Sequence, residues 1–85
     1  METTYYQITL PVDCGTSDGD TLPFGTRVLF VANLASDILV ETLDGRVVTI
    51  TGKILDRVRF CPACDDLIEM HERKRALARA TAERI

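Results

Sequence analysis

The sequence predicts an α+β domain in which a small antiparallel sheet is followed by one long helix. Two observations predict this class: short alternating segments separated by turn residues fill residues 4–60, and uninterrupted helical spacing follows Pro62. A chain of 85 residues is long enough for one domain with a small core. We therefore predict a single domain over 1–85. It comprises a four- or five-stranded barrel or curled sheet over 4–60, SH3-like or OB-like, and an amphipathic helix over 62–84.

The first third of the chain holds two predicted strands and a loop. Residues 4–12 alternate between apolar and polar side chains, and Pro11 restricts this segment to an edge strand or a strand end because it has no N–H. The segment 13–23 is rich in Asp, Gly, Ser and Thr and is predicted to be a loop, which contains Cys14. Residues 26–32 carry a single charge, so we predict that they form a central strand buried on both faces.

The dipeptide Asp44-Gly45 is the strongest local signal for a turn. It separates two strand-like runs and predicts a two-residue type I′ hairpin, in which both central residues have positive φ. In this register Glu41 would pair with Val48.

A further strand is predicted after this hairpin. Gly52 indicates a bulge or a sharp bend. Residues 53–60 are then predicted to form a strand with Ile54, Val58 and Phe60 on one face.

The C-terminal segment changes to helical periodicity. Apolar residues recur at helical spacing, and no Gly or Pro interrupts residues 63–85. Pro62 suits a first helical position, while Asp65 and Asp66 complement the positive end of the helix dipole. A helix of this length would span roughly 30 Å, so its C-terminal half is expected to project beyond the sheet.

The motif Cys61-Pro62-Ala63-Cys64 offers the most distinct chemistry in the chain. Two cysteines at this spacing form half of a structural zinc site, which needs two further ligands. Cys14 and His71 are the candidates to complete it. Alternatively, two chains could each donate Cys61 and Cys64 to one shared zinc ion, which would link a homodimer. A third interpretation is that these cysteines are packing residues at a helix start.

The same motif also permits thiol redox chemistry. Residues 54–75 resemble the strand and active-site turn of thioredoxin-like proteins, through a strand, Cys-Pro-x-Cys and a helix. The resemblance covers about a quarter of the chain and implies that Cys61 and Cys64 are a redox pair. The chain departs from that family after Cys64, because the 21 residues that follow lack the further strands and cis-proline loop that the fold needs.

The helix carries a local basic charge within an acidic chain. The net charge of the whole chain is −3, whereas residues 71–85 hold five basic residues against two acidic ones. The candidates for partner binding are Arg73, Lys74, Arg75 and Arg79. They suit an acidic protein groove or a nucleic acid. The alternative is a solvated helix face with supporting pairs such as Glu69 with Arg73. The aromatic residues, including Phe24 and Phe60, are expected to lie in the core, which weakens a stacking mode for nucleic acids.

The composition excludes several classes of protein. With one histidine and two serines, no nucleophile–base set can be assembled, so we expect no enzyme. No segment predicts a targeting signal or a membrane span, and three cysteines favour a reducing cytoplasm. The leading hypothesis is a small regulatory or adaptor protein, stabilised by zinc, that binds another protein through its helix. Chains of this size and composition occur among phage and mobile-element regulators. The alternatives are a thiol redox or metal-transfer protein and a nucleic-acid-binding module.

Overall fold

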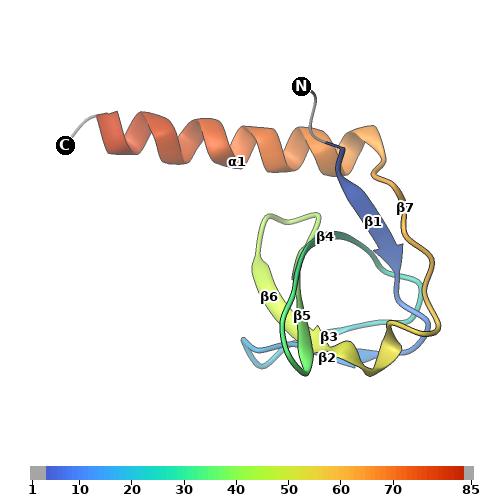
Figure 1. Ribbon diagram of the computed structural model, residues 1–85. Helices are drawn as coiled ribbons and strands as arrows, with labels where there is room; N and C mark the ends of the chain where they lie inside the picture. The colour runs from blue at the N-terminus through green and yellow to red at the C-terminus, as the bar shows by residue number, and fades with distance from the viewer. Residues whose placement is uncertain (1–3, 84–85) are drawn as a thin grey trace.

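The computed structural model describes residues 4–83 and the side chains of residues 4–80. Its strands are β1 (Tyr6–Thr9), β2 (Cys14–Gly15), β3 (Thr21–Leu22), β4 (Arg27–Asn33), β5 (Asp37–Glu41), β6 (Val47–Thr51) and β7 (Cys61–Pro62). Its helices are a 3₁₀ turn, η1 (Gly52–Ile54), and α1 (Asp65–Glu83) (Figure 1). The predicted α+β class, with an antiparallel sheet and one C-terminal helix, is confirmed.

Five strands form one antiparallel sheet in the order β6-β5-β4-β1-β7, and β2 and β3 form a separate hairpin. The predicted central strand is therefore confirmed as β4, but its burial on both faces is not, because Val31 and Asn33 are exposed. The sheet curls, as Figure 1 shows, but it does not close into a barrel, so the barrel form of the prediction is wrong. One edge strand, β7, has only two residues. At the other edge, β6 meets the β2–β3 hairpin through Ser17, whose N–H donates to the Thr49 carbonyl (3.1 Å).

The inner face of the curled sheet holds the main hydrophobic core. This cluster contains ten buried residues, namely Ile8, Leu10, Cys14, Leu22, Val28, Ile38, Val40, Val48, Ile50 and Ile54. The segment 13–23 was predicted to be a loop, but it contains the short β2–β3 hairpin. This hairpin places Cys14 and Leu22 in the inner core. Aliphatic side chains from every part of the sheet domain close the core without a tryptophan.

The β5–β6 hairpin has a different turn from the one predicted. Gly45 has a φ of +87°, but no non-glycine residue among residues 4–83 has a positive φ, which excludes a type I′ turn at Asp44. The Gly45 N–H donates to the Thr42 carbonyl (2.9 Å), so a longer turn ends in a left-handed glycine. As a result Glu41 pairs with Val47, one residue earlier than predicted.

The predicted strand over 53–60 is wrong. Ile54 lies in the 3₁₀ turn η1, and the N–H groups of Leu55 and Arg57 donate to the carbonyls of Gly52 (3.1 Å) and Ile54 (2.8 Å), so the chain turns here while Ile54 and Val58 still pack against the inner core. Gly52 does make the sharp bend that its position predicted. Its N–H donates to the Ser36 carbonyl (3.0 Å), and a Cβ there would lie 2.9 Å from that oxygen, so no other residue fits without a shift.

Helix α1 begins at Asp65 rather than at the predicted residue 62. The reason is that Cys61 and Pro62 pair with β1 as β7, where an edge strand tolerates proline. Cys64 then caps the helix, since the N–H groups of Leu67 and Ile68 donate to its carbonyl (3.0 and 3.1 Å). The predicted end at residue 84 lies outside the described residues.

The outer face of the sheet presents one row of residues to α1. The strand register places Gln7, Leu29, Glu41 and Val47 side by side across β1, β4, β5 and β6. Leu29 (1% exposed) and Leu67 of α1 (0%) are buried outside the inner cluster. They form a second, smaller core between the helix and the sheet.

Only the first turns of α1 are packed on the sheet. From Glu72 to Ala80 every side chain is exposed, and Figure 1 shows the helix running past the edge of the sheet, as its length predicted. Within residues 4–83, no helix combines the length and the apolar composition that crossing a membrane would need.

Candidate functional site

The Cys-Pro-Ala-Cys motif lies at the junction between β7 and α1. Cys61 pairs with Gln7 in the sheet, and the Gln7 side chain also accepts the Cys64 N–H at Oε1 (2.8 Å). The Ala63 N–H donates to the Tyr5 carbonyl (2.8 Å). Backbone bonds to β1 therefore fix the motif on both sides of Pro62. Both thiols are free and exposed, so they can react with an external metal or thiol.

A cation lies beside the second cysteine. Arg27, at the start of β4, contacts Asp66 in the first turn of α1 (Nη2 to Oδ2, 3.0 Å). Asp66, by hydrogen bond and charge, raises the pKa of Arg27, and the Cys64 sulfur adds to this effect. In return the hydrogen bond from Arg27 lowers the pKa of Asp66. The guanidinium thus links the start of β4 to the first turn of α1, next to Cys64.

The third cysteine belongs to the inner core. Cys14 is buried in β2, and its thiol donates to the Val12 carbonyl (3.4 Å). Burial raises the pKa of the Cys14 thiol, and the charge of Asp13 raises it further. Both effects favour the neutral thiol, whereas a metal ligand must be a thiolate.

His71 lies elsewhere again, on the outer face of the sheet. Its Nδ1 is 2.9 Å from Oε2 of Glu41, and the Tyr5 ring packs against the imidazole at a centroid distance of 5.1 Å. Glu41 is only 2% exposed, and its other oxygen, Oε1, is buried without a hydrogen-bond partner among the described residues. The imidazole of His71 is therefore held against a carboxylate of the sheet.

The four predicted zinc ligands occupy three separate places. Cys61 and Cys64 share the β7–α1 junction, Cys14 lies in the inner core and His71 contacts Glu41. Among the described residues, no group of three or more His, Cys, Asp or Glu side chains is arranged to hold a metal ion. The junction alone offers two thiolates, which is half of a tetrahedral site. Zinc binding itself stays a prediction.

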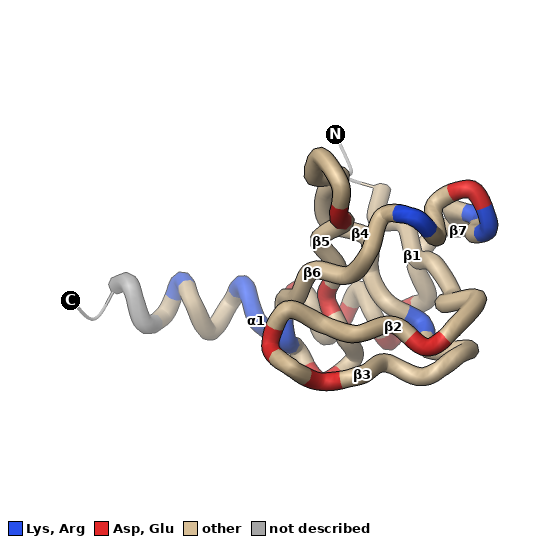
Figure 2. The backbone as a smooth tube through the Cα atoms, turned by 90° about the horizontal axis from the view of Figure 1, so that it is seen from below, with Lys and Arg blue, Asp and Glu red and all other residues tan. Residues whose placement is uncertain are grey.

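Two basic residues of α1 make polar contacts within the described chain, and two others form no ion pair there. Arg73 pairs with Glu69 (3.1 Å), as predicted for helix support, and Lys74 Nζ donates to the Gly45 carbonyl (2.7 Å). Within the described part of the chain, Arg75 and Arg79 form no ion pair. Figure 2 shows basic residues along the projecting helix and acidic residues over the loops of the sheet.

A groove of about 270 Å³ lies where α1 passes over β4, β5 and β6. Its lining includes Val31, Glu41 and Val47 from the strands and His71, Arg75 and Ala78 from the helix. A β-bulge between Phe30 and Ala32 leaves Val31 as the extra residue, and Val31 remains exposed on the sheet. The groove is mostly apolar, with charges at its rim.

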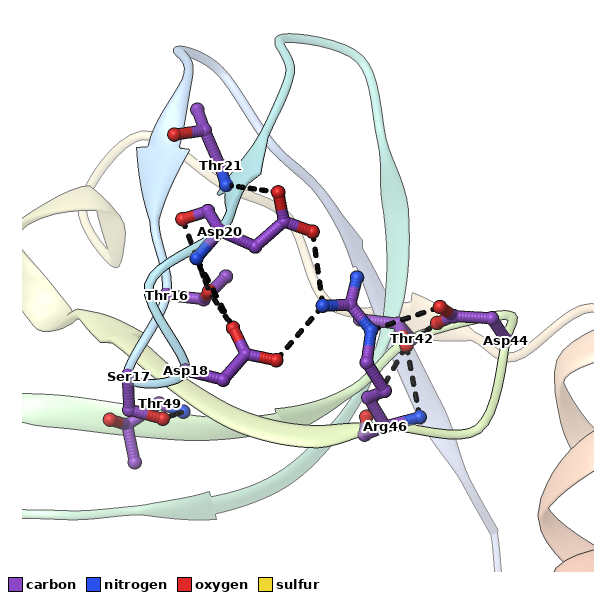
Figure 3. A network of polar contacts seen from close by, with 9 residues as sticks. All are labelled: Thr16, Ser17, Asp18, Asp20, Thr21, Thr42, Asp44, Arg46 and Thr49. Atoms are coloured by element: carbon purple, nitrogen blue, oxygen red, sulfur yellow. Dashed lines mark hydrogen bonds and ion pairs between the residues drawn. The ribbon is translucent and has the colours of Figure 1, made fainter.

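A second polar cluster ties the loops of the sheet domain together (Figure 3). Arg46 contacts Asp18 (2.9 Å), Asp20 (3.0 Å) and Asp44 (2.9 Å), which joins the β2–β3 loop to the β5–β6 turn. The Asp-rich segment was predicted only to be a loop. Here its carboxylates surround a guanidinium, so its role is to hold two loops together over the inner core.

The pairing of Glu41 with His71 was not predicted from the sequence. A signal was available, because Glu41 is the one acid in the strand-like run 38–43 and His71 lies on the apolar side of the predicted helix. The aromatic residues were also misjudged, since Phe24 and Phe60 are exposed rather than buried.

Comparisons with models of known protein families, with curated proteins and with solved structures found no match.

Proposed function

We propose that this chain is a small, non-enzymatic adaptor or regulatory protein that binds another protein through the exposed part of α1. The observation that carries this proposal is the contrast along the helix. Leu67 is fully buried, whereas every side chain from Glu72 to Ala80 is exposed, including Leu77 at 65%. A helix that extends past its own domain provides a surface that the domain does not need for its core.

Helix energetics support this proposal. Isolated helices shorter than about 12–15 residues are marginal in water, so the projecting turns depend on the docked turns for their stability. Acids at the start of α1, Asp65 and Asp66, favour its nucleation there. A partner that binds the projecting turns would recover part of the cost of ordering them.

Site-specific photo-cross-linking tests the proposal. A photoreactive residue in place of Arg79 should yield a cross-linked protein in host-cell extract. The same residue in place of Lys53, an exposed basic residue in η1, is the matched control and should yield none. Cross-links at position 53 alone would refute the assignment of the binding surface to α1.

We also propose that zinc at Cys61 and Cys64 stabilises this adaptor. Cys14 and His71 are held elsewhere, which favours the arrangement in which a second copy supplies the other two thiolates. Both cysteines are exposed and β7 is an edge strand, so two junctions can approach each other. The proposed setting is a reducing cytoplasm, where these thiols remain reduced.

Native mass spectrometry of the purified protein tests the zinc proposal. We expect one zinc ion per two chains, and chelation should release monomers. Cys61→Ser should remove both the metal and the dimer, whereas Cys14→Ser should retain both if it folds. A protein that is purified as metal-free monomers, and whose thermal unfolding is the same with and without chelator, would refute zinc stabilisation.

A thiol redox role is the second candidate, and the position of Arg27 beside Cys64 favours it. In this role Cys61 and Cys64 would lose two electrons and two protons in exchange with a disulfide substrate and form a disulfide themselves. The thioredoxin-like expectation of a full strand before the motif is wrong, because residues 53–57 form turns and residues 58–60 are irregular. Reversible oxidation of Cys61 and Cys64 by oxidised glutathione in metal-free protein would favour redox chemistry over zinc.

A further inference from the structure

We infer that the groove beneath α1 binds a peptide segment of the protein partner in which apolar side chains are flanked by acidic ones. This inference rests on the proposed adaptor function and assigns both the binding site and the chemistry of its occupant. The groove lies between the start of the projecting turns and the uncovered end of the outer row, at Val47.

The shape of the surface suits an extended or helical segment rather than a small molecule. A second cavity of about 280 Å³ shares Val31 and His71 with the groove and continues to Tyr5 and Tyr6. We call the groove and this neighbouring cavity together the channel; they lie side by side across β4, from β6 toward β1. Exposed apolar side chains along it, such as Val31 and Val47, can each receive an apolar side chain of the partner.

The rim of the channel determines the charge of the occupant. Arg75 lines the groove and also lines a third cavity with Arg79 and Tyr5, in which Glu72 contributes one acid. Neither arginine forms an ion pair within the described residues. Two unpaired guanidinium groups beside an apolar channel complement carboxylates of the partner, and arginine binds carboxylates in a bidentate manner.

The wall of the groove also holds a carboxylate. Glu41 lines the groove, with Oε2 in contact with His71 and Oε1 buried within the protein. The acidic side chains of the occupant are therefore expected at the rim, beside Arg75 and Arg79, and not against this wall. The same carboxylate disfavours a phosphate in the groove.

The matched pair of variants Ala78→Glu and Ala80→Glu isolates the groove. Both replace an exposed alanine of the same helix by the same acid, but only Ala78 lines the groove. Glutamate at 78 would fill the apolar channel and repel an acidic segment, whereas glutamate at 80 would leave the channel open. Circular dichroism should show that both variants fold, because alanine and glutamate are both good helix formers.

The test is a selection of phage-displayed random peptides of about twelve residues on the full chain, followed by affinity measurements with synthetic copies. We expect enriched peptides with apolar residues flanked by Asp or Glu. Their affinity should fall with added salt and fall about tenfold or more in Ala78→Glu, while Ala80→Glu changes it less than about twofold. No enrichment, or enrichment of basic peptides, would overturn the inference.

Two further outcomes separate the inference from the proposed function. Equal loss of peptide affinity in both variants would reject the groove but retain helix binding. Unchanged affinity in both variants would reject both the groove and binding through the helix.

A DNA duplex of about twenty base pairs serves as the second ligand. Salt-sensitive binding of this duplex that Ala78→Glu weakens more than Ala80→Glu, in a chain that selects no peptide, would assign the surface to nucleic acid instead.

Discussion

The two faces of the sheet are covered in different ways. Ten buried residues seal the inner face, and the β2–β3 hairpin and η1 close over it. The outer face is covered by the first turns of α1, with Leu29 and Leu67 as its apolar centre and the buried Glu41–His71 pair beside them. Beyond that pair the outer row is open at Val47. The inner face therefore provides most of the stability, whereas the outer face is less completely covered and leaves an accessible apolar surface at Val47.

A cavity in the inner core should have the largest effect. Ile38 is fully buried in β5. Ile38→Ala should lower the free energy of unfolding by about 2–5 kcal/mol, because the lost methyl groups leave a cavity. Urea unfolding followed by circular dichroism measures this loss, and the whole domain should unfold in one transition. A cost below about 1 kcal/mol would show that the inner core is not the main source of stability.

The equivalent cavity on the outer face should act locally. Leu67→Ala should cost about 2 kcal/mol, the lower end of the range for such changes, because the surface near the helix can relax. We expect α1 to lose amide protection in hydrogen exchange while the strands keep theirs. Ile38→Ala is the comparison, since it should reduce protection in both. Uniform loss of protection in Leu67→Ala would mean that the two faces fold as one unit.

The polar pair on the outer face should give a smaller and non-additive effect. His71→Leu should cost about 1–3 kcal/mol because Glu41 remains buried without a partner. The double variant Glu41→Leu/His71→Leu should recover much of this loss, since no buried charge remains. Thermal unfolding of the two single variants and the double variant gives the coupling energy. Additive losses would show that the pair does not act as a unit.

The same comparison explains which parts of the fold could be predicted from sequence. The run 26–32, with its single charge, identified the central strand, and helical spacing after Pro62 identified α1, because each pattern extends over several residues. The segment 53–60 misled the prediction. Ile54 and Val58 also fit a strand pattern, and only the close approach of Gly52 to Ser36 turns the chain into η1.

The candidate site was less predictable, for a related reason. Cys61 and Cys64 were placed correctly at the sheet–helix junction, because their environment is local. The other candidates depended on long-range register. Glu41 lies on the outer face beside Leu29 of β4 and reaches His71 there, and a turn one residue longer than predicted places Val47 rather than Val48 next to it. A one-residue slip in register reverses the face to which each side chain of the shifted strand points.

The smallest predicted effect concerns the charged cluster that joins the loops over the inner core. Hydrogen bonds from Thr16 and Thr42 lower the pKa of Asp18 and Asp44 respectively below the ordinary value of 3.8, and Arg46 lowers both further. A carboxyl group whose pKa is lower in the folded chain than in the unfolded chain stabilises the fold at pH values above its unfolded-state pKa. That contribution is fully present above about pH 4 and is lost as the pH falls through the lower, folded-state pKa.

Each of these carboxylates is largely exposed, so the loss of stability in acid should be modest and salt-sensitive. Asp18→Asn should reduce the pH dependence of the unfolding free energy between pH 5 and pH 2, while Asp56→Asn, the same change at an exposed aspartate after η1, is the control. NMR titration of the side-chain carboxyl groups reports the site directly. If Asp18 titrates at its ordinary value, the cluster does not stabilise the loops, and the inner core would be sealed by its aliphatic side chains alone.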